Sequence, residues 1–124
     1  MRRTSAPGRR PQRVAEQIRQ VAAAFLQEDA RDPRIGLVTI TAVQVTGDLQ
    51  HADIRYVVHG DDAARQQTQE GLDSAVAAVR RRIGQELRLR VVPGVTFTLD
   101  RGAEHATRIE QLLSELRQDE GDGQ

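Results

Sequence analysis

The sequence predicts an α+β domain, in which three strands form one sheet and the helices are segregated from it. Two observations lead to this fold class. Some segments repeat apolar residues at helical spacing and others alternate as strands do, in the order helix, strand, strand, helix, strand, helix. The chain has 124 residues, which is enough for a single hydrophobic core but not for two.

The first predicted helix is amphipathic. Its apolar residues lie on one face of a 3.6-residue period and are Val14, Ile18, Val21, Phe25 and Leu26. The stretch DARDPR ends the helix, because Pro33 disfavours the helical conformation in the preceding residue, Asp32. We therefore expect the first strand to begin shortly after this proline.

The next predicted element of the chain is a β-hairpin. In IGLVTITAVQV, the apolar residues Val38 and Ile40 have even numbers, whereas Val43 and Val45 have odd numbers. In a regular strand these two pairs would point to opposite faces, so their parity differs. The change of parity near Ala42 indicates a bulge or a bend. The stretch TGDLQH supplies the turn, and ADIRYVV alternates regularly, which is typical of a half-buried second strand.

In the second half of the chain, the sequence predicts a helix, a strand and a terminal helix. HGDDAARQQ is typical of a loop and a helix start, with acidic residues near the positive end of the helix dipole. The apolar stripe of this helix consists of Leu72, Val76, Val79, Ile83 and Leu87. After Pro93 and Gly94, VTFTL is the third strand. The last helix, EHATRIEQLLSEL, has the stripe Ile109, Leu112, Leu113 and Leu116.

The formal net charge of zero conceals a strong asymmetry along the chain. Residues 1–20 hold six arginines and one glutamate, residues 78–90 hold five arginines and one glutamate, and residues 110–124 hold five acids and one arginine. From this pattern we predict a flexible basic arm over residues 1–10, a folded domain over 11–117 and a disordered acidic tail over 118–124.

The arginines of AVRRRIGQELRLR are the outstanding feature of the chain. The predicted RNA-binding residues are Arg80, Arg81, Arg82, Arg88 and Arg90, together with Arg9, Arg10 and Arg13 nearer the N-terminus. One interpretation is an ordinary solvated helix face, on which Arg82 pairs with Glu86. We favour a phosphate-binding surface, because most of the cluster lacks local acids. The few aromatic residues lie on core stripes, which favours contacts to the backbone and shape of structured RNA or DNA over base stacking.

No set of residues in the sequence points to catalysis. There is no P-loop, no GxSxG, no zinc-protease motif and no cysteine. A metal site at His51, Asp53 and His59 is conceivable but disfavoured, because short constellations of this kind often arise by chance. We therefore expect no enzymatic activity, metal, cofactor or small-molecule substrate. The lack of cysteine and of long apolar runs favours a cytoplasmic protein without a membrane segment.

Four stretches of the chain resemble the bacterial ribosome-binding factor A family. They are RVAEQIRQ in the first helix, DPRIGLVTITAVQVTGDLQHADIRYVV across the hairpin, LRLRVVPGVTFTLD into the third strand and RIEQLL in the last helix. They occur in the order and at the spacing of that family, over roughly residues 10–116. The resemblance implies a type II KH-like fold with an additional C-terminal helix. It also implies binding to 16S rRNA within the small (30S) ribosomal subunit and a role in late 16S rRNA maturation.

The resemblance further implies a kink between two helices in place of the GxxG turn of ordinary KH domains. The position of this kink matches Ala75, Val76 and Ala77, and Ala77 stands where the family often has glycine. Gly94 and Ala106 also depart from the residues that are usual in the family. We expect a softened kink and a monomeric protein. The alternative functions are a protein-interaction module whose basic patch docks an acidic partner, and a small hydrolase with an unrecognised site.

Overall fold

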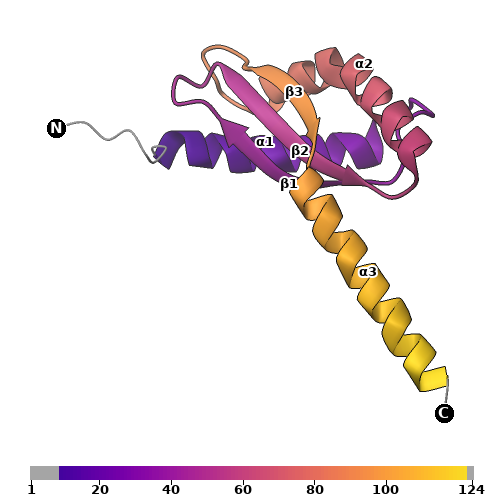
Figure 1. Cartoon of the computed structure of the whole chain (residues 1–124). Helices are drawn as coiled ribbons and strands as arrows, with labels where there is room; N and C mark the ends of the chain where they lie inside the picture. The colour runs from indigo at the N-terminus through magenta and orange to yellow at the C-terminus, as the bar shows by residue number, and fades with distance from the viewer. Residues whose placement is uncertain (1–8, 123–124) are drawn as a thin grey trace.

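The computed structural model describes residues 9–122. The elements in chain order are α1 (Arg9–Glu28), β1 (Val38–Val45), β2 (His51–Val58), α2 (Asp62–Glu86), β3 (Gly94–Leu99) and α3 (Arg101–Asp122). This order confirms the predicted α+β class. The strands form one layer that packs against α1 and α2, whereas α3 extends away from the body of the domain (Figure 1).

The sheet has the order β1-β2-β3, with β1 antiparallel and β3 parallel to β2. A parallel neighbour requires a crossover connection, and α2 provides it. The register of β1 against β2 shifts between Ile40 and Ala42, which confirms the predicted bulge. Because of this extra residue, Val38 and Val43 both face the core although their sequence parity differs.

The hydrophobic core lies between the sheet and the two helices. It combines the predicted stripes of α1 and α2 with alternating residues of β2 and β3. Tyr56 of β2 is buried, and its hydroxyl donates a hydrogen bond to Gln69 of α2. The Gln69 amide in turn donates to the backbone carbonyl of Phe97 at 2.9 Å. This chain of contacts fixes α2 relative to the two strands that it connects.

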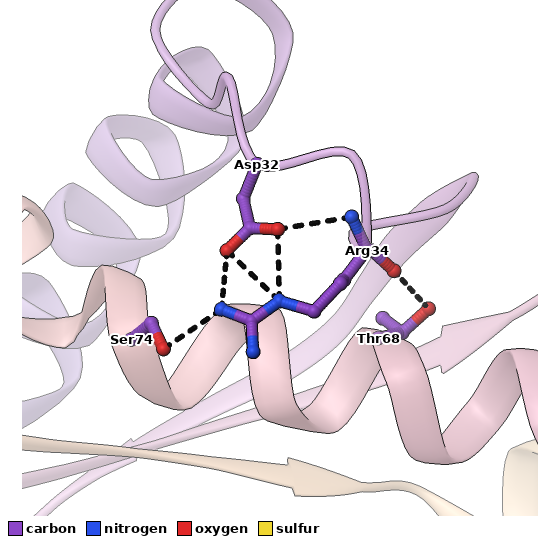
Figure 2. A network of polar contacts seen from close by, with 4 residues as sticks. All are labelled: Asp32, Arg34, Thr68 and Ser74. Carbon is purple, nitrogen blue, oxygen red and sulfur yellow. Dashed lines mark hydrogen bonds and ion pairs between the residues drawn. The ribbon is translucent and has the colours of Figure 1, made fainter.

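The loop between α1 and β1 is held against α2 by side-chain contacts (Figure 2). The Arg34 guanidinium pairs with Asp32 of its own loop at 2.6 Å and donates to Ser74 Oγ of α2 at 3.0 Å. Thr68 Oγ1 donates to the Arg34 carbonyl at 3.4 Å. The loop can approach this closely because Gly71 has no side chain: a Cβ there would lie 2.7 Å from Ile35 Cγ1.

The structure corrects two predicted boundaries. The prediction of a flexible arm through residue 10 is wrong for Arg9 and Arg10, which form the first turn of α1, and residues 1–8 lie outside the described residues. The prediction of a disordered tail from residue 118 is wrong up to Asp122, where α3 ends. Each added helical residue gains a backbone hydrogen bond, and no proline interrupts α3. Residues 123–124 lie outside the described part.

Where the resemblance implies a kink between two helices at Ala75, Val76 and Ala77, α2 is one continuous helix. Alanine has the highest helix propensity, so the local sequence favours continuity. The helix begins at the N-cap Asp61, whose carboxylate accepts from the Ala64 backbone N–H at 2.9 Å. This contact confirms the helix start that was predicted from HGDDAARQQ. A bend within the continuous helix stays a prediction.

Candidate nucleic-acid interface

Arg10 and Arg90, which are far apart in the sequence, line the same hollow on the surface. The hollow has a volume of about 330 Å³ and is formed by the start of α1, the β1–β2 turn and the α2–β3 loop. These three segments lie at one end of the domain (Figure 1). We call Arg9, Arg10, Arg13, Arg88 and Arg90, which are all exposed, the basic end.

The N-terminal arginines of the basic end are held by the first turns of α1. Proline is tolerated in a first turn because the first amides of a helix have no carbonyl partner within it. Pro11 and Val14 are buried against the body, and Arg9, Arg10 and Arg13 are exposed. The helix therefore presents these three guanidinium groups to solvent from a fixed backbone.

The C-terminal arginines of the basic end follow from an alternation after α2. The backbone becomes extended at Leu87, and from there inward and outward side chains alternate. Leu87 and Leu89 pack against the core, whereas Arg88 and Arg90 are exposed. The two arginines that flank Leu89 in the sequence are thus both on the surface.

Arg80 has a structural contact with the same loop. Its Nε donates to the Pro93 carbonyl at 3.1 Å, and its Nη2 donates to the Val92 carbonyl at 3.3 Å. A guanidinium group fits two neighbouring carbonyl oxygens because its N–H donors are arranged as a fork. Arg80 therefore positions the segment that carries Arg88 and Arg90.

The structure corrects the interpretation of Arg82 as a free phosphate ligand. Its guanidinium pairs with Glu28 at 3.1 Å, Asp29 at 2.7 Å and Glu86 at 2.5 Å, and only 19% of its side chain is exposed. The hydrogen bond that Arg82 donates to Glu86, followed by the one that it donates to Glu28, raises the pKa of Arg82 above its ordinary value. The pair with Glu86 confirms the interpretation in which Arg82 pairs within its own helix. The other two carboxylates join α2 to the end of α1.

Arg81 lies apart from the basic end. It lines a shallow hollow with Arg31, beside Asp29 and Arg82. Sequence reasoning missed Arg31, which lies three residues beyond the end of α1 in the stretch DARDPR. The predicted run of three arginines therefore does not form one patch: Arg80 and Arg82 contact the protein itself, and Arg81 lines a separate hollow with Arg31 and Asp29.

The β1–β2 turn contributes one acid to the hollow of the basic end. The Asp48 carboxylate accepts from Thr46 Oγ1 at 2.6 Å and from the Gln50 backbone N–H at 3.1 Å. The hydrogen bond from Thr46 is the larger cause of a lowered pKa at Asp48. This carboxylate fixes the turn, and the arginines around it outnumber it.

The residues of the disfavoured metal site make other contacts. The His51 ring lies 3.1 Å from Thr96 Oγ1, and Asp53 accepts from Thr98 Oγ1 at 2.6 Å. Across residues 9–122 the structure has no group of three or more histidine or acidic side chains arranged to hold a metal ion. Within the same residues, no helix combines the length and hydrophobicity that a membrane span needs.

Comparison with protein families gives one match over most of the chain. The model of the family described as ribosome-binding factor A matches residues 10–113. The ribosome-binding factor A of Geobacter metallireducens is 43% identical over 113 residues, which cover 91% of this chain and 96% of that protein. The match therefore includes the core and most of α3.

Solved structures agree with this match at the level of the fold. The solution structure of a Thermotoga maritima protein is 30% identical, with a TM-score of 0.66, and covers 77% of this chain and 91% of that one. The coordinates of a homology model of the Thermus thermophilus ribosome binding factor A, fitted into a cryo-EM map of a 30S complex, superpose with a TM-score of 0.59 at 21% identity. They cover 70% of this chain and 91% of that one.

Proposed function

Because the chain belongs to the ribosome-binding factor A family, we propose that it binds the small ribosomal subunit and promotes late maturation of its 16S rRNA. The Thermus thermophilus relative is described in a complex with the 30S subunit, which supports this choice of partner. We further propose that the protein acts in the cytoplasm, as a single copy and without a catalytic step.

The proposed contact with rRNA is the basic end. The observation that carries this assignment is that Arg10 and Arg90 line one hollow although they come from opposite halves of the chain. A phosphate backbone contacts several arginines at once and releases counterions when it does so. Arginine also binds phosphate with two parallel hydrogen bonds, which adds a geometric preference.

The proposed contact recognises the backbone and shape of folded RNA. The three aromatic residues of the chain, Phe25, Tyr56 and Phe97, are all buried in the core, with at most 6% of each exposed. They are therefore not available as platforms on which unpaired bases stack. Phosphate contacts position a protein on its nucleic acid without reading the bases. The protein would thus select a surface of the subunit rather than a short sequence.

The experiment measures the affinity of the protein for purified small subunits over a range of salt concentrations. The test variant is Arg88→Gln/Arg90→Gln, and its matched control is Arg19→Gln/Arg101→Gln, which removes two exposed arginines elsewhere. Each lost phosphate contact is expected to lower the slope of log affinity against log salt by about one, so the test variant should lose about two. A test variant with the slope of its control would show that the basic end does not contact phosphate.

A further inference from the structure

Among the residues whose side chains are described, α3 contacts the body of the domain near its start. Asp100 caps it by accepting from the Ala103 backbone N–H at 3.0 Å, and Asp100 also accepts from Thr41 Oγ1 of β1 at 2.6 Å. Glu104 in the first turn pairs with Arg65 of α2 at 3.3 Å. Beyond this point the helix projects from the domain (Figure 1).

The projecting part of α3 carries an apolar stripe that faces away from the body. Its residues follow the spacing i, i+3, i+4 and i+7, and they are Ile109, Leu112, Leu113 and Leu116, with exposed fractions of 44%, 54%, 50% and 58%. The opposite helix face, with Ala103, Thr107 and Gln111, lines a hollow against the sheet. Four large apolar side chains on one exposed helix face are the pattern that a helix uses to bind a groove in a partner.

The charge of this segment decides which kind of partner fits. From Ile109 to Asp122 the sequence of α3 contains five acids and one arginine. A phosphate backbone would repel such a helix, so rRNA is a poor partner for it. A second copy of α3 would bring the same excess of acids against itself. A basic protein surface is the complementary partner.

We propose that α3 docks its apolar stripe into a groove on a basic protein of the small ribosomal subunit. This inference rests on the proposed function and assigns to α3 a contact separate from that of the basic end. A helix of 22 residues is roughly 33 Å long, at a rise of about 1.5 Å per residue. The protein can therefore contact rRNA through its body and a protein neighbour at some distance from it.

The first experiment compares binding to purified small subunits with binding to protein-free 16S rRNA. The test variant is Leu112→Glu/Leu116→Glu, and the matched control is Ser114→Glu/Gln118→Glu. Both change the charge equally, with the same spacing, but Ser114 and Gln118 lie on the helix face opposite the stripe. The test variant is expected to bind subunits about tenfold more weakly than the control, while both bind protein-free rRNA equally.

The outcomes separate this inference from the proposed function. Equal subunit binding by the two variants would overturn the docking of α3, and it would leave the salt dependence of the basic end intact. A loss of protein-free rRNA binding in the test variant alone would overturn it in favour of an RNA contact. A chain that binds neither subunits nor rRNA would overturn the proposed function itself. Circular dichroism melts of both variants check that the body, to which the stripe contributes nothing, stays folded.

The second experiment identifies what lies against the stripe. A photoreactive amino acid in place of Leu113 is irradiated in the complex with small subunits, and cross-linked products are identified by mass spectrometry. The expected product is a cross-link to a single basic subunit protein. The variant Glu110→Lys/Glu115→Lys should lower the yield of this cross-link. Cross-links to rRNA alone, or to a second copy of the chain, would overturn the inference. Sedimentation of the free protein tests the second copy independently.

Discussion

Arg82 of α2 and Asp29 at the end of α1 form an ion pair of 2.7 Å across 53 positions of sequence. Glu28 and Glu86 bind the same guanidinium group, so one arginine holds three carboxylates in place. Arg82 offsets the mutual repulsion of these carboxylates. Arg82 therefore has a structural role.

We predict that Arg82→Gln lowers the urea midpoint of unfolding, whereas Arg81→Gln leaves it unchanged. The first change leaves three neighbouring carboxylates without their cation, and the second removes an exposed group. Urea melts followed by circular dichroism measure both variants. Equal midpoints for the two would contradict the structural role of Arg82. The difference should shrink at high salt, because the partners are half-exposed and ions screen their repulsion.

Gly71→Ala is predicted to destabilise the domain by about 1–3 kcal/mol, although alanine is the better helix former. The added Cβ would lie 2.7 Å from Ile35 Cγ1 and 3.3 Å from the Ile35 backbone nitrogen. The matched control is Gly102→Ala in α3, where the nearest atom lies 3.7 Å away. Free energies of unfolding from urea melts measure both. If Gly71→Ala is as stable as the wild type, the loop does not approach α2 as closely as described.

The contribution of Asp32 to stability is predicted to depend on pH. The hydrogen bond from the Arg34 side chain, supported by its backbone N–H, lowers the pKa of Asp32 from 3.8 to about 2. A pKa lowered by folding stabilises the folded state above pH 3.8, and this contribution is lost as the pH falls towards 2. Melting temperatures of wild type and Asp32→Asn should therefore differ at pH 6 and converge between pH 4 and pH 2. A difference that is constant with pH would contradict this role.

Ala77→Gly tests whether α2 bends where the family is expected to have a kink. Ala77 is exposed within a continuous helix, so glycine should cost about 0.5–1 kcal/mol of stability. Urea melts measure the change, with Ala63→Gly in the first turn of α2 as a helix control. A neutral or stabilising effect at position 77 alone would show that the helix is strained there and bends.

The sequence predicted those parts of the fold that depend on local periodicity. The stripes of α1 and α2 are buried as predicted, and the parity change near Ala42 is a bulge. These features could be predicted because a helix or strand repeats its burial every few residues. The uninterrupted helix at Ala75–Ala77 also agrees with local propensity, and the expectation of a break came from the resemblance alone.

The candidate site could be predicted only in part, because its organisation depends on distant residues. No local pattern shows that Glu28 and Asp29 neutralise Arg82, or that Arg80 binds the carbonyls of Val92 and Pro93. Arg88 and Arg90 are placed outward by a local alternation with Leu89, which the sequence does show. Arginine is long enough to reach several partners, so its role depends on which acids the fold brings near it.

Eighty positions of sequence separate Arg10 from Arg90, so the hollow between them forms only when the chain has folded. An anion that binds there binds the native state and not the unfolded one, and it therefore raises the temperature of unfolding. The hollow also depends on folding while the chain is being synthesised. Until β3 has emerged and paired with β2, the segment with Arg90 has no fixed place beside α1. If the protein binds the small subunit as proposed, incomplete or misfolded chains would consequently compete poorly for it. The subunit would then bind mainly intact molecules.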